Sequence, residues 1–302
     1  MKKGEVLVVG GTGFIGYHLS KKLLRKGFKI TSISSRKPNK KRYLPKVKYI
    51  ICDISNKRLL KKKIKKTFKY VINLGGYVDH SHKKKTFESH YHGCKNLTEI
   101  FQKNFPKAFI QMGSSVEYGN LKSPQKEDKK YSPRHIKSIY GKAKLMATNH
   151  LINLHKKKNF PSVILRLYLA YGPKQDFNRF IPIIIKGCIE NKKFPCSEGQ
   201  QLRDFVYVDD VVDAIIKSLT SEKARGQIIN IGSGKPIKIK KIIEKIKRIS
   251  NSGHPQYGEI KLRKDEILEL YPNIQKAKKL IRWVPKVSFK RGLNKTISSY
   301  EA

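Results

Sequence analysis

Hydrophobic and polar positions follow two rhythms along the first half of the chain. Short apolar runs predict buried strands at residues 6–9, 28–34, 47–52, 70–74, 108–112 and 162–167. The stretches between these runs are rich in lysine and place their apolar residues at helical spacing, beginning with residues 14–26. Strands that alternate with helices are typical of βαβ units, so this half predicts a parallel sheet with helices on its faces.

The rhythm changes after Leu169, where shorter elements are interrupted by Pro173, Pro182, Pro195 and Gly199. A strand at 227–231 and helices near 239–249 and 273–281 follow.

These patterns predict an α/β protein with a Rossmann-type, doubly wound parallel sheet and a smaller C-terminal α/β lobe that binds substrate. The expected dinucleotide-binding domain covers residues 1–168, and the lobe covers residues 169–302. Some segments of the lobe's range, such as 203–232, are candidates to return to the dinucleotide-binding domain.

Three glycines follow the first apolar run directly, at Gly10, Gly13 and Gly16. Gly10 permits a tight strand-to-helix turn, Gly13 lets the backbone approach a phosphate, and Gly16 lets the next helix pack on the sheet. The helix that begins at Phe14 directs its N-terminal dipole at an anion. The segment therefore predicts a site for a dinucleotide pyrophosphate, with an ordinary turn as the alternative.

Composition narrows the possible partners. The 302 residues carry a net charge of +45, and the basic residues are spread from Lys2 to Lys295. They lack the interspersed aromatic side chains on which a protein stacks the bases of single-stranded nucleic acids. We interpret most of this charge as solvated surface, so no specific nucleic-acid partner is expected, although anionic small molecules should be attracted.

The four cysteines predict neither a metal site nor disulfides. Cys52, Cys94, Cys188 and Cys196 form no C-x-x-C pair, and reduced thiols are typical of a cytoplasmic protein. No apolar segment is long enough to span a bilayer, so membrane insertion is not expected.

Tyr140 and Lys144 are one helical turn apart on a predicted helix, and the neighbouring ammonium favours the ionised form of the phenol. A phenol tuned in this way exchanges protons with a carbonyl or an alcohol. Upstream, Ser114 and Ser115 follow the strand predicted at 108–112. Either hydroxyl is placed there to bind the same substrate oxygen or to serve only as a turn serine.

These motifs occur in a familiar order. GGTGFIG (10–16), SSVEYG (114–119) and YGKAK (140–144) are followed by RLYLAYGP (166–173), RDFVYVDD (203–210), NIGSG (230–234) and WVP (283–285). Nearly the whole chain thus resembles an extended short-chain dehydrogenase/reductase acting on nucleotide-sugars. The resemblance implies that Tyr140 is the catalytic acid–base, that Lys144 binds the nicotinamide ribose, and that Ser114 orients the reacting oxygen.

The resemblance also implies the other cofactor contacts. Phe14 and Ile15 begin the first helix, and Leu74, Gly75 and Gly76 follow or end the fourth strand. Asp53, followed by Ile54, resembles the acid that holds the adenine edge, and Tyr168 resembles an aromatic residue near the nicotinamide. NAD enzymes usually carry a carboxylate at the end of the second strand, but this chain has Ser34, Ser35 and Arg36 there. Arg36 offers a fork of donors to a 2'-phosphate, so NADP is preferred over NAD, unless Arg36 is only a solvated base.

Substrate contacts are implied in the second half. Arg203 and Arg263 resemble the pair that binds a nucleotide diphosphate, and the further candidates are Asp79, Ser115, Glu117 and Arg179. His80 and His82 accompany Asp79 in a loop whose alternative reading is plain exposure to solvent. The chain departs from the family pattern at Leu169 and His90, where asparagine is usual.

The expected reaction is NADPH-dependent reduction of a 4-keto-6-deoxy nucleotide-sugar. Ser115 and Val116 replace the acidic pair of a 4,6-dehydratase, and Glu117 comes one position late. The first alternative is a 4-epimerase that retains NAD, and a more distant one is a non-catalytic NADP-sensing or nucleic-acid-binding protein. The family further implies a homodimer through helices at about 85–104 and 137–158.

Overall fold

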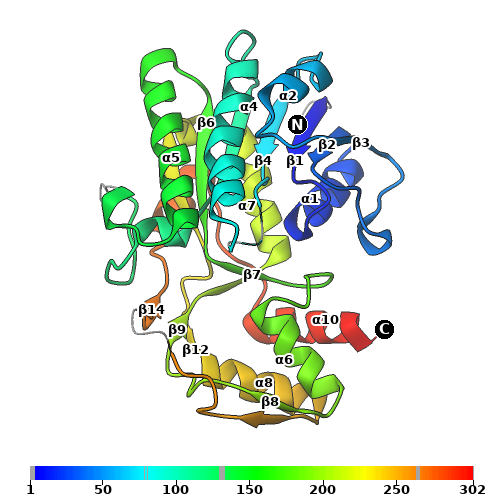
Figure 1. Cartoon of the computed structure of the whole chain (residues 1–302), viewed down its shortest axis with the longest axis vertical. Helices are drawn as coiled ribbons and strands as arrows, with labels where there is room; N and C mark the ends of the chain where they lie inside the picture. Colours follow the sequence, from blue (N-terminus) through cyan, green and yellow to red (C-terminus); the bar gives the residue numbers. More distant parts are fainter. Residues whose placement is uncertain (1–3, 78, 80, 129–132, 263–265, 302) are drawn as a thin grey trace.

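A parallel sheet of seven strands forms the centre of the molecule in the computed structural model, which describes residues 4–77, 79, 81–128, 133–262 and 266–301 (Figure 1). Its strands, in chain order, are β1 (Glu5–Val9), β2 (Lys29–Ser34), β3 (Val47–Ile51), β4 (Tyr70–Asn73), β5 (Ala108–Ser114), β6 (Ser162–Leu167) and β11 (Gln227–Ile231). The predicted Rossmann-type fold is confirmed.

The strand order β11-β6-β5-β4-β1-β2-β3 reverses direction between β1 and β4. The chain builds the sheet outward from β1 to β3, then returns to β4 and builds the other half. Ligands of such sheets bind beyond the carboxyl ends of the strands at this switch point. The loops after β1 and β4 are therefore the first place to look for a cofactor site.

Helices cover both faces of the sheet: α1 (Phe14–Arg25), α2 (Lys57–Lys63), α3 (Lys83–Phe87), the π-helical turn η2 (Glu88–His92), α4 (Gly93–Phe101), α5 (Ile139–Lys158) and α7 (Val208–Thr220). Successive side chains of each strand point to opposite faces of the sheet. Val8 belongs to the core under α1 and α7, whereas Leu7 belongs to the core under α2, α4 and α5. Burial on both faces explains why the strands are continuous apolar runs.

The lobe lies below the carboxyl edge of the sheet in Figure 1 and has a core of its own. This core joins α6 (Phe180–Ile189), α8 (Ile239–Ser250) and α10 (Phe289–Glu301). Short strands complete it: β7 (Leu169–Tyr171) pairs with β10 (Phe205–Tyr207), β8 (Lys193–Pro195) with β13 (His254–Gln256), and β9 (Leu202–Arg203) with β12 (Ile237–Lys238) and β14 (Glu269–Leu270). Between these segments, α7 and β11 return to the sheet, and α9 (Gln275–Ile281) packs on β11.

The structure adds elements that the hydrophobic pattern does not predict. The fifth strand runs two residues beyond the expected 108–112, so Ser114 is its last residue. The π-helical turn η2 and the helix α10 were not expected either. All four cysteines are free and buried, and no helix in the described ranges is long and apolar enough to cross a membrane.

Candidate functional site

The glycine turn after β1 has the geometry of a phosphate cradle. Gly10 adopts φ +77°, and its N–H donates to the carbonyl of Ile33 at 2.7 Å. A Cβ at Gly16 would collide with the Gly10 carbonyl oxygen and the Gly11 backbone. Gly13 is the N-cap of α1, so no side chain caps the helix, and its first turn holds no acidic residue. The first amides of α1 are left for an anionic ligand, which fits a dinucleotide pyrophosphate.

Phe14 and Ile15 present their backbone to this turn. The Phe14 side chain packs against the core of the lobe, and Ile15 packs against the core of the sheet. Their predicted contact with a cofactor is therefore one of main-chain amides rather than side chains.

The loop after β4 meets the glycine turn at the switch point. The Leu74 N–H donates to the Val9 carbonyl at 3.0 Å, and the Gly75 N–H donates to Asn73 Oδ1 at 3.1 Å. A Cβ at Gly10 would lie 3.0 Å from the backbone of both Leu74 and Gly75. The lack of a side chain at Gly10 therefore lets the two loops approach closely.

The residues after β2 and β3 define the expected adenosine end of the site. Ser34 is buried, and its Oγ accepts from the Thr12 N–H at 3.4 Å. Arg36 lies two residues further on, is exposed, and has no hydrogen bond or ion pair within the described part of the chain. Asp53 follows β3 and accepts from the Ser55 N–H and hydroxyl at 2.9 and 2.8 Å, while Ile54 beside it is buried.

Tyr140 and Lys144 lie on the first turns of α5, next to the end of β5. The helix is capped by Ser138, whose Oγ accepts from the Gly141 N–H at 3.0 Å. Lys144 is buried, donates from Nζ to the Met112 carbonyl of β5 at 2.7 Å, and lies 5.8 Å from the centroid of the Tyr140 ring. One ammonium group thus joins the helix that carries the phenol to the strand that ends in Ser114.

His90 contacts Tyr140, and the sequence patterns do not predict this contact. The π-helical turn η2 places its imidazole edge-on to the phenol, with the ring centroids 4.9 Å apart. The imidazole also lies against Gly76, where a Cβ would collide with it, and its Nε2 lies 3.2 Å from the Tyr77 carbonyl. His90 therefore connects the loop after β4 with the predicted acid–base.

Glu117 has surroundings that differ from the predicted sugar contact. It lies in the 3-10 turn η3 (Ser115–Tyr118), and its side chain is 0 % exposed. The carboxylate accepts from the Ser114 N–H at 2.7 Å, from the Thr148 hydroxyl at 2.7 Å and from Arg166 Nε at 2.9 Å. A carboxylate so enclosed has no surface for a sugar hydroxyl, so its role here is to hold β5, α5 and β6 together. Ser115 is buried as well.

Tyr168 is a core residue in this structure. Its hydroxyl donates to Gln125 Oε1 at 2.6 Å, and burial raises the pKa of the phenol. This environment favours packing over the predicted position beside a nicotinamide.

The predicted substrate residues are only partly brought together. Arg203 is buried and forms an ion pair with Glu266, and it also donates to the Leu202 and Leu268 carbonyls at 3.0 and 3.3 Å. Arg179 is exposed at the start of α6. Arg263 and His80 lie outside the described residues.

Asp79 is exposed near the switch point and accepts from the Ser81 N–H and hydroxyl. Its other carboxylate oxygen lies 3.9 Å from His82 Nε2.

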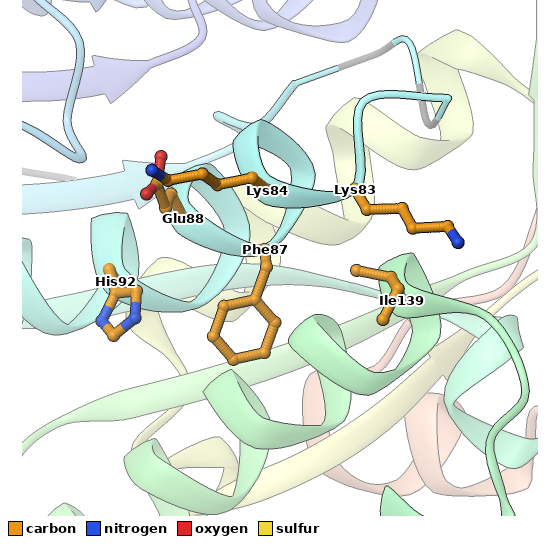
Figure 2. A pocket seen from close by; sticks show the side chains of 6 residues that line it. All are labelled: Lys83, Lys84, Phe87, Glu88, His92 and Ile139. Carbon is orange, nitrogen blue, oxygen red and sulfur yellow. The ribbon is translucent and has the colours of Figure 1, made fainter.

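A surface cavity of about 340 Å³ lies apart from the glycine turn, between α3, η2 and the start of α5. Figure 2 shows the side chains that line it: Lys83, Lys84, Phe87, Glu88, His92 and Ile139. The cavity is lined by none of the predicted catalytic side chains. It is on the helical face through which the expected homodimer would form.

Comparison with known proteins decides the family. The sequence model of the NAD dependent epimerase/dehydratase family matches residues 6–232, which include the glycine turn, Ser114, Tyr140 and Lys144. The chain belongs to this family. It is accordingly an enzyme of the extended short-chain dehydrogenase/reductase type, as its motifs indicate.

Individual relatives span the whole chain. A UDP-glucuronate 4-epimerase of Thermodesulfobacterium geofontis is 29% identical, with 98% of this chain and 95% of the relative covered. A CDP-abequose synthase of Salmonella muenchen is 27% identical, with 98% of each chain covered. The X-ray structure of Pal from Bacillus thuringiensis matches with a TM-score of 0.89 at 26% identity, covering 98% of this chain and 99% of that one.

Proposed function

We propose that the protein reduces the 4-keto group of a 4-keto-6-deoxy nucleotide-sugar at the expense of NADPH. The observation that carries the proposal is the assembly of Ser114, Tyr140 and Lys144 at the carboxyl edge of β5, beside the glycine turn after β1. The residue types fit proton transfer to an oxygen, and the glycine turn fits a dinucleotide.

Each of the three residues has one task in the proposed reduction. Ser114 donates a hydrogen bond to the substrate carbonyl oxygen, and Tyr140 delivers the proton that turns this oxygen into a hydroxyl. Lys144, held by the Met112 carbonyl at 2.7 Å, places a positive charge near the phenolate that remains. When bound, the nicotinamide supplies the hydride to the carbonyl carbon.

The chain's own residues support NADP as the preferred cofactor. No carboxylate follows β2, where one would repel a 2'-phosphate, and Arg36 is exposed at this point with its guanidinium available. The family is described as NAD dependent, so NAD is the alternative that the cofactor assay must separate.

The environment of Glu117 argues against 4,6-dehydration. That reaction needs a carboxyl group beside the reacting sugar, and the positions after Ser114 hold Ser115 and Val116. Glu117, the nearest carboxylate along the chain, is enclosed by Ser114, Thr148 and Arg166.

A 4-epimerase is the second candidate, favoured by relatives such as the UDP-glucuronate 4-epimerase. It uses the same three residues but retains NAD and returns the hydride to the opposite face of the sugar. No net cofactor consumption would distinguish it from a reductase.

We further propose that Asp79 and Arg179, both exposed, contact the substrate, and that Arg203 binds its diphosphate after releasing Glu266. We also propose the homodimer that the family resemblance implies, formed through the helices at about 85–104 and 137–158. Analytical ultracentrifugation tests it directly: a monomer at micromolar concentration would reject it.

The proposed function is tested with purified protein and UDP-, GDP-, CDP- and dTDP-linked 4-keto-6-deoxy sugars, with NADPH or NADH. We expect loss of NADPH absorbance with at least one sugar and a matching amount of reduced product. Interconversion of 4-epimers without cofactor loss would instead establish the epimerase. Turnover of neither kind would reject both.

A further inference from the structure

The edge of the sheet where the strands begin is strongly basic, and we call it the amino-edge face. Helices that connect parallel strands run back from the carboxyl edge, so the last turns of α1, α2, α5 and α7 gather here. Their last turns hold Lys22, Arg25, residues 61–63, residues 156–158 and Lys217.

Lysines also precede or begin three of four neighbouring strands at this edge. The Lys29 N–H donates to the Gly4 carbonyl at 3.2 Å, and the Lys69 N–H donates to the Glu5 carbonyl at 2.9 Å. The Lys107 N–H in turn donates to the Lys69 carbonyl at 2.8 Å. These bonds follow the sheet order β2-β1-β4-β5, so each of the four neighbouring strands except β1 begins beside a lysine.

Few carboxylates balance this charge in the described part of the face. Glu5 is paired with Lys66 at 2.5 Å, and Glu99 in the last turn of α4 is paired with Lys57 at 2.6 Å. Asp213 of α7 lies 3.9 Å from Lys217, and Glu222 follows the end of α7. Basic side chains therefore outnumber carboxylates on the described part of this face.

An exposed aromatic side chain lies within the face. Phe105 is 43 % exposed, stands between Lys103 and Lys107 along the chain, and contacts Phe160 edge-on with centroids 5.3 Å apart. Aromatic residues flanked by lysine are typical of proteins that bind the interface of a membrane.

We propose that the amino-edge face docks peripherally on anionic lipid membranes. Lysine dominates it, and the flexible lysine side chain suits a fluid layer of lipid phosphates, whereas nucleic-acid sites rely on arginine forks and stacked aromatics. The catalytic edge is the opposite edge of the sheet, so docking leaves the site open to substrate (Figure 1). The inference is independent of the proposed reaction.

The test compares two variants of equal charge. The first changes Lys61, Lys62, Lys63 and Lys65 of the face to Gln, and the matched control changes Lys241, Lys245, Lys247 and Arg248 of α8 in the lobe to Gln. All eight side chains are exposed, and α8 also ends in basic residues, so the control removes the same charge from a comparable helix. Thermal melting checks that both variants fold.

Binding is measured by co-sedimentation with phosphatidylcholine vesicles, with or without phosphatidylglycerol, at physiological salt. We expect the wild type to bind only the anionic vesicles. Because each basic residue near such a surface contributes about fivefold in affinity, the face variant should bind at least about a hundredfold more weakly. The lobe variant should bind like the wild type.

Three results would overturn the proposal. Equal losses in the two variants would show that net charge alone acts, without a preferred face. Failure of the wild type to bind anionic vesicles would exclude the lipid partner. Release of the protein from vesicles by an equal charge of duplex DNA would make a nucleic acid the preferred partner.

Discussion

Replacing Glu117 by Gln removes one negative charge from the most enclosed ion pair next to the proposed catalytic residues. The side chains of Arg166 and Glu117 are 2% and 0% exposed, and Arg166 Nε donates to the carboxylate at 2.9 Å. The same carboxylate accepts from the Ser114 N–H and the Thr148 hydroxyl, both at 2.7 Å. It thus joins the strand of Ser114 to the helix of Tyr140.

The size of the effect follows from which partner is left unsatisfied. Glutamine keeps one oxygen for the Ser114 N–H, and the Thr148 hydroxyl can rotate to accept from the new amide. Arg166 Nε loses its acceptor and the guanidinium loses its counter-charge, and breaking a buried pair on one side costs about 3–5 kcal/mol. Thr148→Val, which leaves the ion pair intact, should cost about 1.5–3 kcal/mol.

Urea unfolding, followed by far-UV circular dichroism and by the fluorescence of the single, buried Trp283, measures both free energies of unfolding. Glu190→Gln is the control, because it removes an exposed pair with Lys192 and should leave the unfolding curve unchanged. A loss for Glu117→Gln within about 0.5 kcal/mol, the range of ordinary surface substitutions, would show that this ion pair does not stabilise the fold.

Three further predictions concern the cofactor site and the lobe contact. Arg36→Asp should raise the KM for NADPH at least about tenfold and favour NADH, as expected for a lost charge-assisted contact; an unchanged preference would reject the contact. Gly16→Ala should abolish NADPH binding in calorimetry, because its Cβ would collide with the Gly10 carbonyl, and wild-type affinity would contradict this geometry. His18 of α1 makes the lobe contact, because its Nε2 lies 2.8 Å from the Pro173 carbonyl oxygen. Burial lowers the pKa of His18, so unfolding takes up a proton below pH about 6.5 and stability should fall as the pH decreases. Thermal melts of His18→Gln should show a weaker dependence of the melting temperature on pH over this range. The same dependence as in the wild type would show that His18 does not cause it.

The sheet could be predicted from the sequence because burial on both faces leaves a simple signal. The runs at 162–167 and 227–231 match β6 and β11 residue for residue. A parallel strand with helices on both sides is a continuous apolar run, so its first and last residues can be recognised in the sequence. The glycine turn was predictable for a similar reason, since its requirements are local to Gly10, Gly13 and Gly16.

The site was less predictable where a distant residue decides the environment. Glu117 appears in the sequence as a polar group beside a reactive serine, but Arg166, 49 positions later, holds it in the core. His90 contacts Tyr140 from the π-helical turn η2, and residues 88–92 show no apolar periodicity that would predict this turn. Such contacts depend on tertiary packing, which local patterns do not contain.

In the proposed function, Tyr140 passes a proton to a nucleotide-sugar oxygen beside a bound nicotinamide. Its most direct test is Tyr140→Phe, assayed for turnover with the sugar that the wild type accepts and for NADPH binding by calorimetry. The phenol oxygen is lost while Lys144 keeps its bond to the Met112 carbonyl. We predict that turnover falls at least about a thousandfold, within the range of acid–base contributions, with NADPH affinity nearly unchanged. A variant that turns over its sugar at the wild-type rate would contradict the account.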